Sequence, residues 1–203
     1  HGSMSWSPST DSRLSLSKKG TPKWRQRTEE LPSAVIAYSR GDLTALPADT
    51  PSVTIENRGI NDDDLVVLER FAALKVLNLG SSPGTTDDGL RYLAKLKKLE
   101  VLTLSGDILS GAGFRRLVDL PELRELTVHN SERLTDQGIA AIAELKQLTK
   151  LRLWWAKALS DRQVFELTKL KALRDFHVWG CSEITNDGLR HIAELPNLES
   201  LIL

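Results

Sequence analysis

The stretch LTKLRLWWAKALSDRQVFELTKLKA, residues 148–172, contains the pattern that determines the fold. It opens with Leu-x-x-Leu-x-Leu, and the same pattern, with conservative apolar replacements, recurs along the chain. Its successive starting residues are Leu74, Leu99, Leu123, Leu148, Leu173 and Leu198. These starts are 25, 24, 25, 25 and 25 residues apart, and an earlier unit places Val53 and Ile55 one period before Leu77 and Leu79. So regular a period predicts a stack of similar supersecondary units.

Each unit divides into a strand and a helix. Alternation such as Leu151-x-Leu153 is typical of a short strand with one inward face. After a loop, each unit has a polar residue that can cap a helix, namely Asn61, Thr86, Ser110, Thr135, Ser160 and Thr185. Apolar residues then recur at helical spacing, as in Leu90, Leu93 and Leu96. Because one unit cannot bury its own apolar face, we expect an α/β right-handed solenoid, with parallel strands inside the curve and short helices outside.

One run of residues resembles a known repeat. Cys181-Ser182-Glu183-Ile184-Thr185-Asn186-Asp187-Gly188-Leu189 is similar to the repeat of cysteine-containing leucine-rich-repeat proteins, and the run from Ser131 to Ile139 matches nearly as well. The resemblance covers roughly residues 50–203 and implies a leucine-rich-repeat solenoid that binds proteins. The subclass resembles the substrate-receptor half of F-box ubiquitin-ligase subunits, and many bacterial proteins share it.

Two departures favour the bacterial type of relative over the F-box type. Four units lack the Cys or Asn that the subclass often has, and carry instead Ser82, Asp107, Ser131 and Ala156. The stretch from Leu31 to Pro47 is too short for the helical bundle of an F-box.

The sequence predicts four segments. Residues 1–4 read as a tag remnant, and residues 5–30 as a flexible tail that is Ser-rich and basic. Residues 31–50 are expected to cap the array, with a helix that Ser33 caps and that runs through Arg40 to end at Gly41. Residues 51–203 form the array and finish in a strand that begins near Leu198. Because that last strand would leave an open edge, self-association through it is expected.

Composition narrows the function further. Lys plus Arg and Asp plus Glu are 27 each, so the chain lacks the basic excess of a typical nucleic-acid binder. Cys181 is the single cysteine, which favours a reducing compartment and a cytoplasmic location. The chain has no apolar run of the length that a membrane span needs, and no motif that would hold a metal or cofactor. We therefore expect no enzymatic activity.

Strand alternation places one set of side chains on the inner surface of the sheet. The first units present small polar residues there, whereas the later units present aromatic and basic ones. Exposed Trp and Arg are typical of protein interfaces, and Arg152 beside Trp154 would permit a cation–π contact. A Trp that folds over the sheet edge and packs on its neighbours is the structural alternative. The candidate partner-binding residues are His129, Arg152, Trp154, Trp155, His177 and Trp179.

Three functions remain open. The first is a non-catalytic protein-binding module that uses these residues. The second is the recognition subunit of a ubiquitin-ligase-like assembly or a secreted bacterial effector, because the Ser-rich tail is similar to effector export segments. The third is small-molecule or sugar binding by the Trp cluster.

Overall fold

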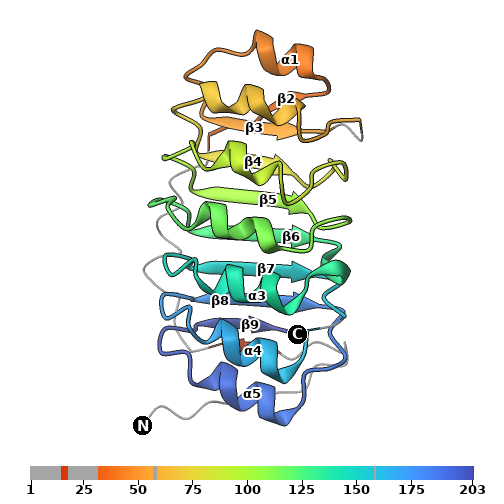
Figure 1. Ribbon diagram of the computed structural model, residues 1–203. Coiled ribbons are helices and arrows are strands. Elements are labelled where there is room, and N and C mark those ends of the chain that lie inside the picture. The colour runs from red at the N-terminus through yellow and green to blue at the C-terminus, as the bar shows by residue number, and fades with distance from the viewer. Residues whose placement is uncertain (1–14, 18–31, 57–58, 158) are drawn as a thin grey trace.

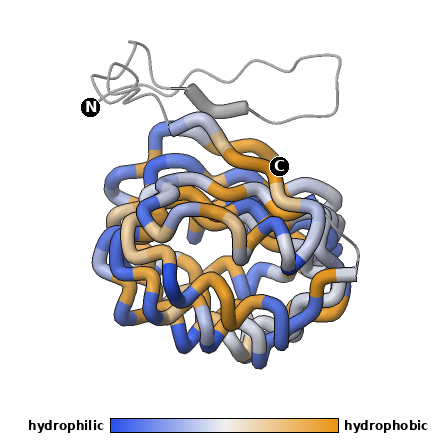
Figure 2. The backbone as a smooth tube through the Cα atoms, turned by 90° about the horizontal axis from the view of Figure 1, so that it is seen from above, coloured by the Kyte–Doolittle hydropathy of each residue, from blue (hydrophilic) through white to orange (hydrophobic). Residues whose placement is uncertain are grey.

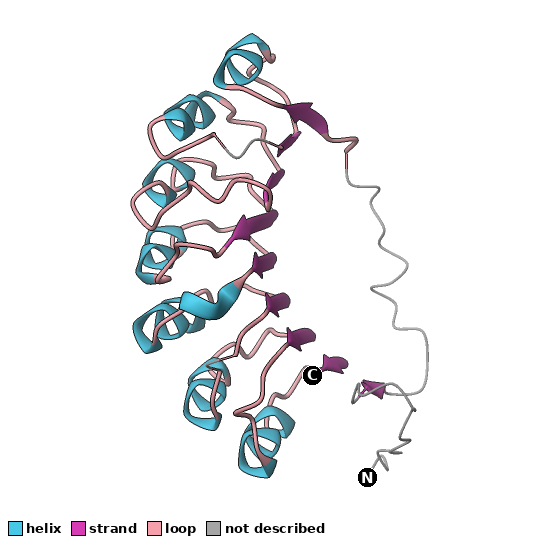
Figure 3. Cartoon of the chain, turned by 90° about the vertical axis from the view of Figure 1, so that its right-hand side faces the viewer, coloured by secondary structure: helices cyan, strands magenta, loops and turns pink. Residues whose placement is uncertain are grey.

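The computed structural model describes residues 15–17, 32–56, 59–157 and 159–203. These residues form one open sheet in the order β1-β9-β8-β7-β6-β5-β4-β3-β2, and β2 to β9 run parallel. The short helices lie along the outer side of the curve and the strands along its inner side (Figures 1 and 3). The predicted leucine-rich-repeat solenoid is confirmed.

The elements follow the predicted repeat. The strands are β1 (Ser15–Ser17), β2 (Val35–Ala37), β3 (Ser52–Ile55), β4 (Val76–Leu79), β5 (Val101–Ser105), β6 (Glu125–His129), β7 (Lys150–Trp154), β8 (Asp175–Trp179) and β9 (Ser200–Ile202). The α-helices are α1 (Arg40–Ala45), α2 (Leu90–Leu93), α3 (Asp136–Ala143), α4 (Asp161–Leu167) and α5 (Asn186–Ala193). The 3-10 helices are η2 (Asp64–Arg70), η3 (Ala112–Leu117) and η4 (Ser131–Arg133).

The core is a ladder of equivalent apolar side chains. Leu102 of β5 is in register with Leu77 of β4 and Leu126 of β6, and the ladder continues through Leu151 to Phe176. All of these side chains are buried, and each contributes about 1.5–3 kcal/mol relative to an exposed position. Hydrophobic and hydrophilic segments alternate around every coil when the stack is viewed along its axis (Figure 2).

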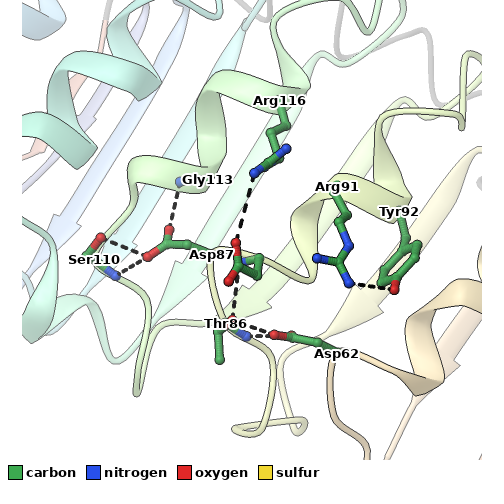
Figure 4. A network of polar contacts seen from close by, with 9 residues as sticks. Asp62, Thr86, Asp87, Arg91, Tyr92, Ser110, Gly113 and Arg116 are labelled. Carbon is green, nitrogen blue, oxygen red and sulfur yellow. Dashed lines mark hydrogen bonds and ion pairs between the residues drawn. The ribbon is translucent and has the colours of Figure 1, made fainter.

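Aspartates at the helix starts also join the coils (Figure 4). Asp62 accepts hydrogen bonds from the backbone N–H and the hydroxyl of Thr86, one coil further on. Asp87 repeats this with Ser110, and Asp161 with Thr185. These carboxylates thus give partners to backbone N–H groups at or just before the start of the next helix, which have none within that helix.

The predicted helix from Ser33 to Gly41 is wrong. Val35–Ala37 forms strand β2, which pairs with β3, and helix α1 begins only at Arg40 with Ser39 as its N-cap. The β-branched residues Val35 and Ile36 favour a strand, and the neighbouring β3 supplies the hydrogen-bond partners that stabilise it. Gly41 therefore lies in the first turn of a helix and does not end one.

The structure corrects the predictions for the N-terminal tail and for the edge of the last strand. Ser15–Ser17 forms β1, antiparallel to β9, although the sequence assigned these residues to a flexible tail. The open edge that was expected at the last strand, with self-association through it, is therefore occupied by the chain itself. The tag residues 1–4 and the rest of the tail lie outside the described residues. None of the helices within the described ranges combines the length and apolar character that a membrane crossing requires.

Candidate partner-binding surface

Five of the six predicted site residues lie on strands of the sheet, the sixth, Trp155, directly follows one, and none of the six is buried. Arg152 and His177 are register partners on β7 and β8, as are Trp154 and Trp179 one position further along. His129 ends β6, and Trp155 directly follows β7. The structure thus brings together residues from three successive coils, as the strand alternation predicted.

Three of these rings stack into what we call the aromatic column, formed by His129, Trp154 and Trp179. The ring centroids of His129 and Trp154 are 5.0 Å apart, and those of Trp154 and Trp179 are 5.1 Å apart. Contacts of this kind contribute about 0.5–1.5 kcal/mol beyond the buried area. Trp154, which has a ring on each side, is partly buried, whereas Trp179 at the end of the column is 38% exposed.

Small residues on the preceding coils make room for the column. A Cβ atom at Gly80 would lie 3.2 Å from Cδ2 of His129, so the imidazole leans across the intervening strand toward Gly80. Ser105, the register partner of His129, is only 2% exposed although it belongs to the inner surface. Gly80 and Ser105, which the sequence presented only as small polar positions, therefore provide the space in which His129 lies.

Trp155 lies beside the column with an unusual backbone. Its φ is 61°, in the left-handed region, and its side chain is 54% exposed. The equivalent positions of the flanking coils have the same conformation but hold Asn130 (φ 53°) and Gly180 (φ 73°), which adopt it readily. A bulky residue in this region is uncommon and carries strain. The indole lies close to Gly180, where a Cβ would be 3.4 Å from Cε3 of Trp155.

Charged side chains lie in the adjoining rows. Lys150 pairs with Glu125 across the strands at 2.6 Å, and Arg152 lies 3.8 Å from the same carboxylate. These contacts join β6 and β7 laterally. The predicted cation–π contact between Arg152 and Trp154 is not among the contacts of the described residues, because Arg152 is directed to Glu125 and Trp154 stacks on other rings.

Burial shifts several pKa values on this surface. Burial raises the pKa of Asp175, and Lys150 nearby opposes that rise. Burial lowers the pKa of both His129 and His177, and Arg152 adds to the effect at His177. His177 Nε2 lies 3.1 Å from the hydroxyl of Ser200. The two imidazoles therefore favour the neutral form, which suits an apolar contact better than a charged one.

Metal binding and nucleophilic catalysis each need particular groups of side chains. Within residues 15–17, 32–56, 59–157 and 159–203, no group of three His, Cys, Asp or Glu residues could hold a metal ion. Cys181 is half-buried against the core, and burial raises the pKa of its thiol, which opposes the thiolate form that a nucleophile needs. The helix-start carboxylates Asp62, Asp87 and Asp161 accept hydrogen bonds from neighbouring coils.

Sequence reasoning missed one feature of the inner surface. A hollow of about 570 Å³ lies near the strand ends of the first coils and is lined by Glu56, Gly80, Ser81, Pro83, Ser105, Asp107 and Asn130. The small residues Gly80, Ser81 and Ser105 could have indicated the hollow, because their side chains leave space at the ends of β4 and β5.

Comparison with known proteins supports the fold. No family model matches the chain, and no curated protein sequence matches it. Internalin C2 of Listeria monocytogenes is similar in structure, with a TM-score of 0.60 and 25% sequence identity over 81% of this chain and 65% of that one. For a second internalin of this organism, inlF, the alignment covers 77% of this chain and 54% of inlF, with 17% sequence identity and a TM-score of 0.47. This chain thus spans somewhat less than two thirds of internalin C2. The repeat, the fold and the similarity to internalin C2 define the protein as a leucine-rich-repeat solenoid.

Proposed function

We propose that this protein is a non-catalytic interaction module that binds a protein partner on its concave surface, through His129, Arg152, Trp154, Trp155, His177 and Trp179. The observation that carries the proposal is the exposure of two Trp side chains at the ends of neighbouring strands, Trp155 directly after β7 and Trp179 at the end of β8. Exposed Trp clusters mark interfaces, and the inner surfaces of solenoids are where such proteins bind. The single Cys181 fits a reducing compartment, so a cytoplasmic location is part of the proposal.

A secreted bacterial effector is the second candidate, and the similarity to internalin C2, a bacterial protein, favours it over a ubiquitin-ligase subunit. Both remain protein-binding functions at the same surface. Sugar binding fits the geometry less well, because sugars stack on open aromatic faces. Trp154 has a ring about 5 Å away on each neighbouring strand, which limits the access of a sugar to it.

The test compares the unaltered chain with a Trp154→Ala/Trp179→Ala variant in quantitative capture of proteins from bacterial and from host lysates. Phe165→Ala is the matched control, because Phe165 is a half-exposed aromatic residue on helix α4, on the outer side of the solenoid. We expect the double variant to lose its partner while the control retains it, with circular dichroism spectra unchanged in both. A partner that binds the double variant as tightly as the unaltered chain would contradict the proposal.

A further inference from the structure

The hollow on the first coils is acidic. Its two ionisable side chains are Glu56 and Asp107, and none of the described residues that line it is cationic. Asp107 is held in place by a hydrogen bond from the Ser105 hydroxyl and another from Asn130 Nδ2 at 3.0 Å. Among the described lining residues the charge is therefore negative, and one of the two carboxylates is fixed, which favours a positively charged occupant.

The hollow and Trp155 belong to one line of equivalent positions. Asn130 lines the hollow, Trp155 occupies the same position one coil later, and Gly180 follows after another coil. All three have left-handed backbones, so the chain turns in the same way at each coil. Neighbouring strands are about 4.8 Å apart, so the hollow and Trp155 lie on one strip of surface along the strand ends, which we call the trough.

Two features at the other end of this trough point to a ligand contact. Trp155 keeps a strained backbone although its indole remains half-exposed, so packing within the fold accounts for only part of its presence. Next to it, Gly180 is exposed, and Trp155 lies in the space where a side chain of residue 180 would be, so a ligand that reaches Gly180 also meets Trp155. Strain that leaves an aromatic ring open to solvent is typical of a ligand clamp.

We propose that this trough binds an extended peptide segment of the partner, with a Lys or Arg side chain in the acidic hollow and an apolar side chain against Trp155 above Gly180. The two ends lie about two and a half strand spacings apart, or roughly 12 Å. An extended chain rises about 3.3 Å per residue, so the basic and apolar residues should be three or four positions apart. The inference deepens the proposed function and rests on it, because it names the chemistry of the partner at that surface.

A display library of random 12-residue peptides, selected on the full chain, tests this directly. We expect the enriched peptides to share a Lys or Arg three or four positions from an aromatic or large aliphatic residue. Their affinities would be measured by fluorescence polarisation against three variants. Glu56→Gln/Asp107→Asn removes the charge of the hollow, Trp155→Asn keeps a residue suited to the left-handed backbone, and Glu122→Gln is an exposed carboxylate control outside the trough.

The hollow variant and the Trp155 variant should each weaken binding at least tenfold, and the control should not. Replacing the basic residue of the peptide with Gln should weaken binding to the unaltered chain but not to the hollow variant, a comparison that does not depend on how the variants fold. Peptides that lack the paired residues, or that bind both trough variants normally, would overturn the inference.

The variant Trp154→Ala/Trp179→Ala separates this outcome from a failure of the proposed function. If those same peptides no longer bind this variant, the proposed function still stands; if they bind it as well, the proposed function fails too. An unenriched library would overturn the peptide inference alone, because a folded partner could still be captured by the concave surface.

Discussion

Replacing Asp87 with alanine is expected to destabilise the junction between two coils. The Asp87 carboxylate accepts four hydrogen bonds from the next coil. Three come from the N–H and the hydroxyl of Ser110, both at 2.8 Å, and from Gly113 N at 2.8 Å (Figure 4), and the fourth comes from Gly111 N at 3.0 Å. Both glycines are buried, so their N–H groups would lose their partner where water has little access.

The size of the effect follows from these contacts. A hydrogen bond to a charged group contributes about 1.5–3 kcal/mol, but bonds that share one carboxylate are not additive, and water can replace the bonds at the half-exposed Ser110. We therefore expect a loss of about 3–4 kcal/mol in the free energy of unfolding. Asp88→Ala is the matched control, because Asp88 is exposed and its side chain only approaches Arg116, at 3.9 Å. Such a surface pair contributes less than about 1 kcal/mol.

Urea unfolding followed by circular dichroism measures the difference, with linear extrapolation to water. A repeat array can also unfold in parts, so hydrogen exchange of the Gly111 and Gly113 amides reports the local junction. We expect both amides to exchange faster in Asp87→Ala, and to keep their exchange rates in Asp88→Ala. If the two variants had equal stability, or if Asp87→Ala lost less than about 1 kcal/mol, the aspartates would not join the coils as described.

Three further predictions follow from the same packing. Gly138→Ala should destabilise the fold by about 3 kcal/mol or more in urea unfolding, because its Cβ would lie 2.2 Å from a backbone oxygen of the preceding coil. Gly80→Val should push the His129 ring away, so that the imidazole becomes hydrated and its lowered pKa rises toward the ordinary value, as NMR titration would show. Hydrogen bonds from Thr185 lower the pKa of Asp161 in the folded protein. The ionised Asp161 therefore stabilises the fold fully above the ordinary pKa of 3.8, and this stabilisation is lost as the pH falls from 3.8 through the lower pKa of the folded state. Asp161→Asn should remove that part of the acid-induced decline in stability.

Each of these predictions has a control within the chain. A Cβ atom at Gly41 would lie no closer than 3.4 Å to its nearest neighbour, and Gly41 is in helix α1. Gly41→Ala should therefore leave the stability of the fold unchanged or increase it. Ser81→Val, on the exposed side of the hollow, should leave the pKa of His129 as it is. Thr185→Val should reduce the acid dependence as Asp161→Asn does, and an unchanged pH profile in both variants would refute the assigned cause.

Much of the candidate surface could be predicted from strand alternation. Because side chains alternate strictly along a strand, the pairing of Arg152 with His177 and of Trp154 with Trp179 followed once the period was known. The lean of His129 toward Gly80 could not be predicted, because it depends on the rotamer that the stacked rings select. The hollow could not be predicted either, since its shape depends on where Asp107 is held by Ser105 and Asn130.

The stacked architecture follows from the sequence alone, because a leucine pattern repeated every 24 or 25 residues leaves each unit with an apolar face that only another unit can cover. Strand alternation also indicates which strand side chains line the inner surface. That Val35–Ala37 is a strand depends on long-range contacts, because the hydrogen bonds that favour it come from β3, a different part of the chain. The pairing at the edge of β9 is likewise a matter of tertiary structure, since a contact between residues 15–17 and 200–202 leaves no periodic signal in either segment.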